Sequence, residues 1–255
     1  LALAQEVPDN VSVLVITQPQ LDLMPGEVDK LLRYVEHGGN LLWLVDAEPL
    51  HGLERLAEPL DLLLPFGIVI DPAATEMNAP ATWSLGAAYP PHAVTHNFNL
   101  ITAFPSARPL VWNENPEWQN SVLVEAAARG WVSRTAPKGK PRFDKQHDTP
   151  GPAVIALALQ RNVNDREQRI VVVGSDAYLS NSFAGNGGNV DLGVNMVNWL
   201  ASEEHLIAIQ PRATKDSNLV LSRMQLNIIS FGFLLAVPLL LALVGGVIWW
   251  KRRRS

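Results

Sequence analysis

Apolar and polar positions follow one another along the first part of the chain in blocks that predict alternating strands and helices. Residues 11–16, 41–45 and 68–70 are short apolar runs rich in Val, Ile and Leu, typical of buried strands. Residues 25–38 open with Pro and close with Gly, and residues 52–64 form a second helical stretch. In the first helix four apolar residues share one face: Val28, Leu31, Leu32 and Val35. This order of elements predicts a parallel sheet with covering helices.

The pattern is less regular in the middle of the chain and becomes clear again later. Residues 121–126 and 154–160 predict strands on either side of a long polar loop, and residues 170–173 predict a central strand. A helix follows over residues 190–202, and residues 206–209 predict a closing strand. We therefore expect an α/β fold, a mostly parallel sheet flanked by helices.

The last apolar stretch is the longest in the chain. Residues 228–250 contain Ser230 as their only clearly polar side chain, and as a helix they would span about 34 Å. Two tryptophans close the stretch and a basic tail, residues 251–255, follows at once. The sequence therefore predicts a transmembrane helix over residues 226–250. Within it two pairs of small residues four apart would let a neighbouring helix pack closely: Gly232 with Ala236, and Ala242 with Gly246.

This helix sets the expected organisation of the rest. Residues 1–210 would form one domain of a longer chain, and residues 211–225 a connector to the membrane. Because basic residues favour the cytoplasmic side, we expect the tail in the cytoplasm. The domain would then lie outside, in the periplasm of a bacterium, with the chain anchored in the cytoplasmic (inner) membrane.

Composition and charge exclude several classes of function. The chain has no cysteine, so it has no disulfide, thiolate metal site or cysteine nucleophile. Its net charge is −5, and the tail contributes +4, so residues 1–225 carry −9. An acidic domain is a poor candidate for binding nucleic acid.

The stretch VVVGSDAYLSN, residues 171–181, resembles a strand-to-helix junction of the kind that holds nucleophiles. Ser175 lacks the G-x-S-x-G pattern, because Val173 stands two residues before it. Small polar residues at a strand end also serve as turns and helix caps, which is the role we favour for Ser175, Asp176 and Asp46. A serine hydrolase that uses Ser175 remains an alternative.

The Asn- and Gly-rich run that follows also invites a ligand-binding interpretation. It contains Asn181, Asn186 and Asn189 but neither a P-loop nor a G-x-G-x-x-G motif, so we expect no nucleotide and no other cofactor. Open α/β sheets bind ligands beyond the carboxyl ends of their strands, so a small-ligand receptor is a second alternative. Its pocket would involve these residues together with Asp46, Ser175 and Asp176.

Two histidines, His92 and His96, are four residues apart. Pro90 and Pro91 argue against the helix that would bring the two rings to one metal ion, and no carboxylate is suitably spaced. We expect no metal site.

Three stretches carry a resemblance to a known family: PQLDLMPGEVDKLLRYVEHGGNLLWLVD, PPHAVTHNFNLITAFPSARPL and RIVVVGSDAYLSNSFAGNGGNVDLGVNMVNWL. With these the chain resembles the auxiliary component of gliding-motility-type ABC transport systems. The resemblance implies a class I glutamine-amidotransferase-like, flavodoxin-like domain, similar to one in an intraflagellar transport protein. It also implies a non-catalytic, membrane-anchored subunit that works beside an ABC-2-type permease and an ATPase, with contacts to substrate or envelope partners.

Overall fold

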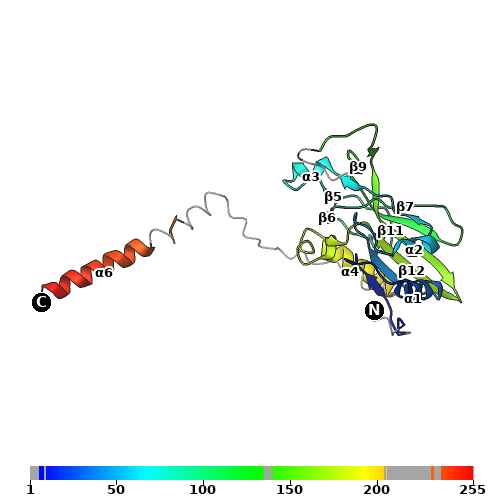
Figure 1. Cartoon of the computed structure of the whole chain (residues 1–255), viewed down its shortest axis with the longest axis horizontal. Helices are drawn as coiled ribbons and strands as arrows, with labels where there is room; N and C mark the ends of the chain where they lie inside the picture. The colour runs from blue at the N-terminus through cyan, green and yellow to red at the C-terminus, as the bar shows by residue number, and fades with distance from the viewer. Residues whose placement is uncertain are drawn as a thin grey trace. The chain divides into compact units, whose positions relative to one another are not determined.

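The computed structural model describes residues 6–8, 10–134, 139, 141–203, 205, 231–232 and 237–254. The chain divides into two compact units, Leu1–Gln210 and Pro211–Ser255. The first unit holds every described strand (Figure 1).

A five-stranded sheet forms the centre of the first unit, in the order β1-β2-β12-β11-β8. Its strands are β1 (Leu14–Ile16), β2 (Leu41–Leu44), β12 (Arg166–Val173), β11 (Ala153–Val163) and β8 (Gln119–Ala126). β1, β2 and β12 run parallel to one another, whereas β11 is antiparallel to both β12 and β8. The sheet is therefore mixed, and the expectation of a mostly parallel sheet is wrong.

A tight turn accounts for the antiparallel half of the sheet. Val163 pairs with Arg166, so only Asn164 and Asp165 connect β11 to β12. Both connecting residues have positive φ, 51° and 60°. Two positive φ angles are the geometry of a two-residue hairpin turn that matches the twist of its strands, and Asn and Asp tolerate it well. Strands joined by so short a turn must run antiparallel.

Three smaller sheets complete the strand content, in the orders β10-β9-β4, β3-β7 and β5-β6. Their strands are β3 (Leu62–Leu63), β4 (Ile68–Ile70), β5 (Trp83–Gly86), β6 (Thr102–Pro105), β7 (Val111–Trp112), β9 (Trp131–Ser133) and β10 (Thr149–Pro150). The apolar run at residues 68–70 is a strand, but it lies outside the central sheet and pairs antiparallel with β9. The position beside β2 is taken by β12 instead.

The helices of the first unit are short except for two of 12 residues each, α1 (Pro25–Glu36) and α4 (Asn189–Leu200). The others are α2 (Glu54–Ala57), η1 (Glu58–Leu60), α3 (Pro72–Glu76) and η2 (Ala177–Leu179). The N-cap of α1 is Met24, whose side chain makes no capping hydrogen bond. Its backbone N–H donates to the Glu27 carboxylate at 3.0 Å, which is half of a capping box.

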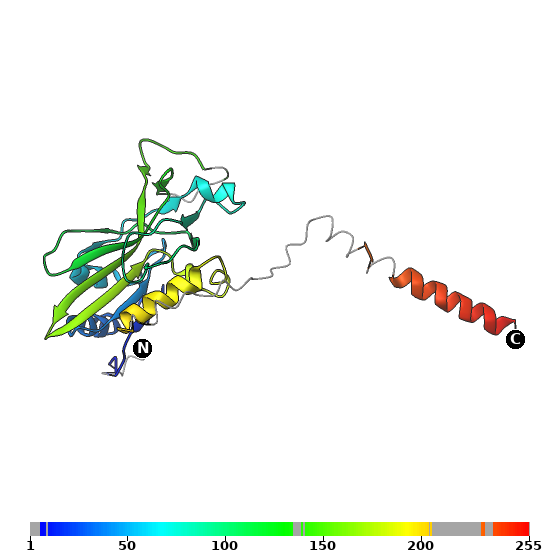
Figure 2. The same ribbon diagram turned by 180° about the vertical axis from the view of Figure 1, so that it is seen from behind.

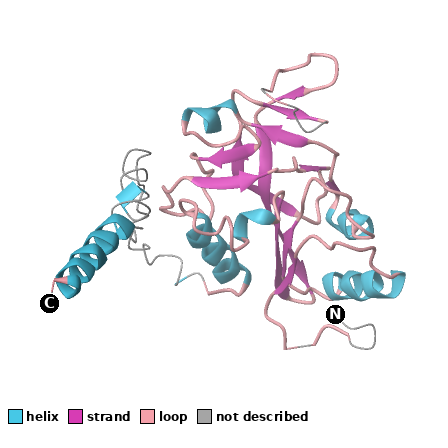
Figure 3. Cartoon of the chain, turned by 60° about the vertical axis from the view of Figure 1, so that its left-hand side comes forward, coloured by secondary structure: helices cyan, strands magenta, loops and turns pink. Residues whose placement is uncertain are grey.

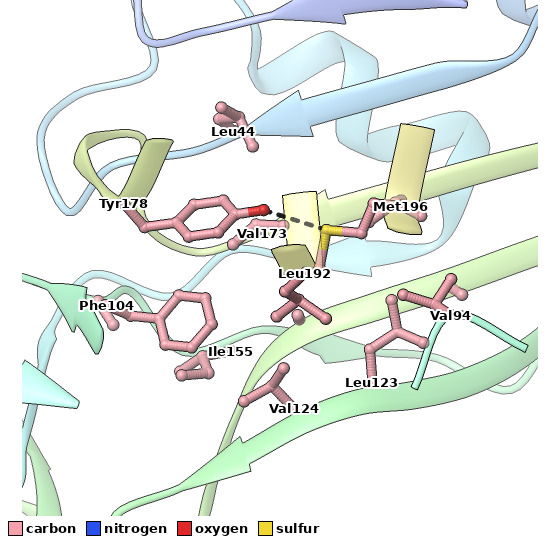
Figure 4. Packing of buried hydrophobic residues seen from close by; sticks show 14 of the residues in the cluster. Leu44, Val94, Phe104, Leu123, Val124, Ile155, Val173, Tyr178, Leu192 and Met196 are labelled. Carbon is pink, nitrogen blue, oxygen red and sulfur yellow. Dashed lines mark hydrogen bonds between the residues drawn. The ribbon is translucent and has the colours of Figure 1, made fainter. Parts of the chain in front are cut away.

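The two longer helices cover opposite faces of the central sheet (Figure 2). Leu42, Leu44, Val171 and Val173 point to the face on which α4 packs, whereas Leu41, Trp43, Ile170 and Val172 point to the face of α1 and α2. Alternation along each strand sends neighbouring side chains to opposite faces, which produces these two cores. Figure 3 shows helices on both sides of the strands. Figure 4 shows the α4 side, where the Tyr178 hydroxyl lies 3.2 Å from the Met196 sulfur.

The second unit contains α6 (Val237–Arg253), a helix of 17 residues that ends in three basic residues. A membrane-spanning helix needs about 20 predominantly apolar residues. Among the residues that the structure describes, no helix combines the length and the apolar character needed to cross a membrane. The prediction of a transmembrane helix over residues 226–250 is therefore wrong. The expected anchoring in the cytoplasmic membrane, which depended on that helix, is wrong with it.

Of the four small residues expected to pack helices together in a membrane, the structure describes three. Gly232 is described, Ala236 lies outside the described residues, and Ala242 and Gly246 belong to α6. The expected connector, residues 211–225, and the expected strand at residues 206–209 also lie outside them.

Candidate functional site

The carboxyl ends of the three parallel strands bring together polar residues from distant parts of the sequence. Gln18 follows β1, Asp46 follows β2, and Asp176 follows β12. The Asp46 N–H donates to the Gln18 side-chain oxygen at 3.3 Å, and the Asp176 carboxyl group is near enough to raise the pKa of Asp46. This edge is where open α/β sheets place ligands. We define Asp46, Asp176 and Gln18 as the carboxyl edge.

Burial and a neighbouring carboxyl group both act on the ionisation of Asp46. Burial raises the pKa of Asp46, and the neighbouring Asp176 carboxyl raises it further. The Ala47 N–H, which donates to Asp46 at 2.6 Å, and the charge of Arg108 lower that pKa in part. The carboxyl oxygens at this edge can accept hydrogen bonds from a cationic or hydroxylated group.

Arg108 is the residue of this region that the sequence did not reveal. Its side chain is buried, and it donates to three backbone carbonyls: Asp46 at 3.0 Å, Glu48 at 3.2 Å and Pro65 at 3.1 Å. Burial lowers the pKa of Arg108, while Asp46 and Glu54 oppose that change. The guanidinium therefore joins the loop after β2 to the loop before β4. Its only sequence signal is a charged residue inside the apolar stretch FPSARPL.

Ser175 lies beside the carboxyl edge but points into the protein. Its side chain is fully buried, and its hydroxyl donates to the Pro105 carbonyl at 2.7 Å. The preceding residue, Gly174, has the Arg108 carbonyl 2.0 Å from where a Cβ would stand. A strand end packed this closely needs glycine for space and a small donor beside it. The geometry favours a structural role for Ser175, in holding the end of β12 to the end of β6.

The three asparagines of the loop before α4 have different environments. Asn189, the first residue of α4, is fully buried and donates to the carbonyls of Ala103 at 2.9 Å, Tyr178 at 3.0 Å and Phe183 at 3.1 Å. Its side-chain oxygen accepts from the Ala103 N–H at 2.8 Å. Asn181 is exposed and Asn186 is half-buried. The polar groups of Asn189 are therefore engaged with the backbone, and this residue organises the loop before α4.

The two histidines have different environments. His92 packs edge-to-face against Trp199, with ring centres 4.9 Å apart, while His96 is exposed. Within the part of the chain that the structure describes, no three His, Cys, Asp or Glu residues are grouped so that they could hold a metal ion.

Comparison with solved structures shows a shared fold. The amino-terminal domain of mmIFT52 has a TM-score of 0.53 and 14% sequence identity, over 75% of this chain and 77% of that one. A ThuA-like protein from Bacteroides uniformis ATCC 8492 has a TM-score of 0.40 and 15% identity, over 74% and 69% of the two chains. A cytoplasmic protein from Salmonella typhimurium LT2 has a TM-score of 0.43 and 14% identity, over 77% and 71%. Scores below 0.5 establish no common fold, so only the first likeness bears on the architecture.

Comparison at the level of sequence gives the family. No curated protein matches the chain. The family model described as ABC-type uncharacterized transport system matches residues 1–202, which is most of the chain and nearly all of the first unit. The chain therefore belongs to this family of auxiliary components of ABC transport systems.

Proposed function

We propose that the α/β domain is the non-catalytic working part of an auxiliary subunit and that it contacts the permease of its ABC transport system. The observation that carries this proposal is the family match, because it covers residues 1–202, nearly all of the first unit. Hydrolysis of ATP would belong to a separate ATPase subunit, since the sequence has no P-loop. The finer assignment, a gliding-motility-type system and an amidotransferase-like domain, rests on the three stretches quoted above.

The environment of the candidate nucleophile supports a role without catalysis. A serine nucleophile must be exposed to substrate and activated by a neighbouring base. The Ser175 hydroxyl is instead buried and donates to a backbone carbonyl. Asn189 is also buried, and the hydrogen bonds of its side chain are likewise made with backbone groups.

The outer face of α4 offers a position at which to probe the contact. Three valines on this face are exposed, Val190, Val194 and Val197, and they line a groove of about 360 Å³. A lysine at Val194 would place a charge in the middle of this surface without disturbing the core, because Val194 is 51% exposed.

Co-purification of the full-length tagged protein in gentle detergent tests the proposal. We expect an ABC permease and an ATPase to be recovered in stoichiometric amounts. Recovery of the folded protein alone, at native expression level, would contradict the proposal. Val194→Lys is compared with Asn181→Lys, which adds the same charge on the nearby exposed loop. A loss of the permease with the first variant alone would locate the contact on α4.

A small-ligand receptor is the second candidate, favoured by the paired carboxyl groups of Asp46 and Asp176. Its ligand would bind at the carboxyl edge through hydrogen-bond donors. A groove of about 320 Å³ runs along β1 next to this edge, and Thr17 and Pro19 belong to its lining. Native mass spectrometry of the freshly purified protein tests this candidate: a bound metabolite that is lost in Asp176→Asn supports it, and an unliganded mass does not.

A further inference from the structure

A short segment between β5 and β6, residues 90–98, packs on α4 through Val94 and His92. Val94 is fully buried and belongs to the same apolar cluster as Leu192, Met196 and Trp199 of α4 (Figure 4). The Asn195 side-chain amide donates to the Val94 carbonyl at 3.0 Å. We call residues 90–98 the strap.

His92 fixes the conformation of the strap through its neutral form. The backbone N–H of Val94 donates to the His92 Nδ1 at 3.2 Å. That nitrogen can accept a hydrogen bond only while it carries no proton, so any ring proton of the neutral imidazole lies on Nε2. The ring also packs edge-to-face on Trp199, at an interplanar angle of 70°.

The charged group that faces His92 from the sheet is Arg169 of β12. The Arg169 guanidinium lies 5.1 Å from the centre of the Trp199 ring and donates to the Trp199 carbonyl at 2.7 Å. It pairs with Glu167 at 2.5 Å. From α4 the facing side chain is Trp199, which has no charge, and within the strap His96 is exposed. Burial lowers the pKa of His92, and the positive charge of Arg169 lowers it further.

We propose that the strap is proton-operated: it lies on α4 while His92 is neutral and separates from α4 when His92 takes up a proton. A proton on Nδ1 replaces the acceptor with a donor that faces the N–H of Val94, so the hydrogen bond is lost. The new positive charge also lies near Arg169 in a half-buried position, where water screens it incompletely. Separation withdraws Val94 from the core and uncovers Met196 and Trp199 on α4.

The direction of the pH dependence follows from linkage. The free imidazole has a pKa of 6.5, and the pKa of His92 in the closed strap is lower. The open strap therefore binds the extra proton. Its equilibrium constant for opening is constant above pH 6.5 and rises as pH falls towards the lowered pKa. Because one proton is taken up, the rise is at most about tenfold per pH unit. The strap needs no transport partner, so its test is independent of the proposed function.

Hydrogen exchange of the full chain at a series of pH values tests the strap. The amides to follow are those of Thr95 and Phe98, which donate to the carbonyls of His92 and Thr95 at 3.1 Å each. After correction for the intrinsic dependence on pH, we expect their exchange to be constant above pH 6.5 and to accelerate as the pH falls below that value. His96→Gln, which removes the exposed histidine of the same segment, is expected to leave this acceleration unchanged.

His92→Asn separates the role of the proton from the role of the ring. An Asn side chain can accept from the N–H two residues later, as Nδ1 does, and it does not titrate in this range. We expect this variant to keep the strap closed and to lose the acceleration. A direct NMR titration of the His92 ring in the unaltered protein needs no variant. A pKa at or above 6.5, or the same acceleration in His92→Asn, would overturn the proposal.

Discussion

Gly174→Ala is the substitution whose effect the structure determines most sharply. A Cβ at this position would stand 2.0 Å from the Arg108 carbonyl oxygen and 3.1 Å from its carbon. Ordinary contact begins at 3.4 Å, so the two backbone segments would have to separate by about 1.4 Å. A flexible side chain could move away, but the obstacle here is backbone.

The backbone around Gly174 has little freedom to yield. The Arg108 N–H donates to the Gly174 carbonyl at 2.6 Å, and the Gly174 N–H donates to the Ile155 carbonyl at 2.8 Å. A displacement of Arg108 would also loosen its side-chain hydrogen bonds to the loops at Asp46 and Pro65. Overpacking alone costs about 1–3 kcal/mol. Loss of one hydrogen bond adds about 1 kcal/mol, so we expect Gly174→Ala to lower the free energy of unfolding by about 3 kcal/mol.

Urea unfolding followed by circular dichroism measures this difference, with Gly26→Ala as the matched control. Gly26 lies in the first turn of α1 and has nothing within 4 Å of the position of its Cβ. The same substitution there should raise the free energy of unfolding by about 0.5–1 kcal/mol, because Ala favours the helix. If Gly174→Ala stayed within about 0.5 kcal/mol of the unaltered protein, the close approach of Arg108 to β12 would be wrong.

Three further substitutions test the polar groups near α4 and the carboxyl edge. Asn189→Ala removes four hydrogen bonds to backbone groups and should lower the free energy of unfolding by about 3 kcal/mol in the same urea assay. Its control is Asn181→Ala at an exposed position, which should change the free energy of unfolding by less than about 0.5 kcal/mol. Ser175→Ala leaves the Pro105 carbonyl without its donor, so we expect a loss of about 1 kcal/mol and an unchanged circular dichroism spectrum; a gain in stability would contradict the hydrogen bond. Asp46→Asn should stabilise the protein at neutral pH, because burial raises the pKa of Asp46 above 3.8. Ionisation of Asp46 therefore costs folding free energy as the pH rises through the raised pKa, and the gain in stability from Asn should vanish below pH 3.8. A gain that is independent of pH would refute this explanation.

Local pattern was sufficient for the two longer helices of the first unit and for the existence of the five strands of the central sheet. The apolar face and the first Pro predict α1 to within two residues of its observed end at Glu36. The expected helix over 190–202 is α4, observed as Asn189–Leu200. The expected helix over 52–64 is wrong in extent: α2 and η1 are separate short pieces, and β3 begins at Leu62. Asp61 ends η1 with a positive φ of 50°, a feature that apolar periodicity does not report.

The candidate site was only partly accessible to sequence reasoning. Asp46, Ser175 and Asp176 were singled out because they follow strands, and the structure places them at the carboxyl ends of β2 and β12. Arg108 has no recognisable sequence signal because its partners are the backbone carbonyls of Asp46, Glu48 and Pro65. Every residue type has a backbone carbonyl, so such partners cannot be identified from their side chains. The opposite roles of Asn181 and Asn189, one exposed and one buried, were likewise invisible in a run of similar residues.

The sequence by itself determined the two longer helices, the strands of the central sheet and the apolar faces of these elements, because these properties depend on residues a few positions apart. The hairpin of β11 and β12 is also encoded locally, because Asn164 and Asp165 tolerate the positive φ angles of its two-residue turn. Only the tertiary structure decided that β12 pairs with β2 and that residues 68–70 join β9 instead of the central sheet. These pairings join segments far apart in the chain, and their free energy depends on which surfaces remain to be buried once every element competes for the same core.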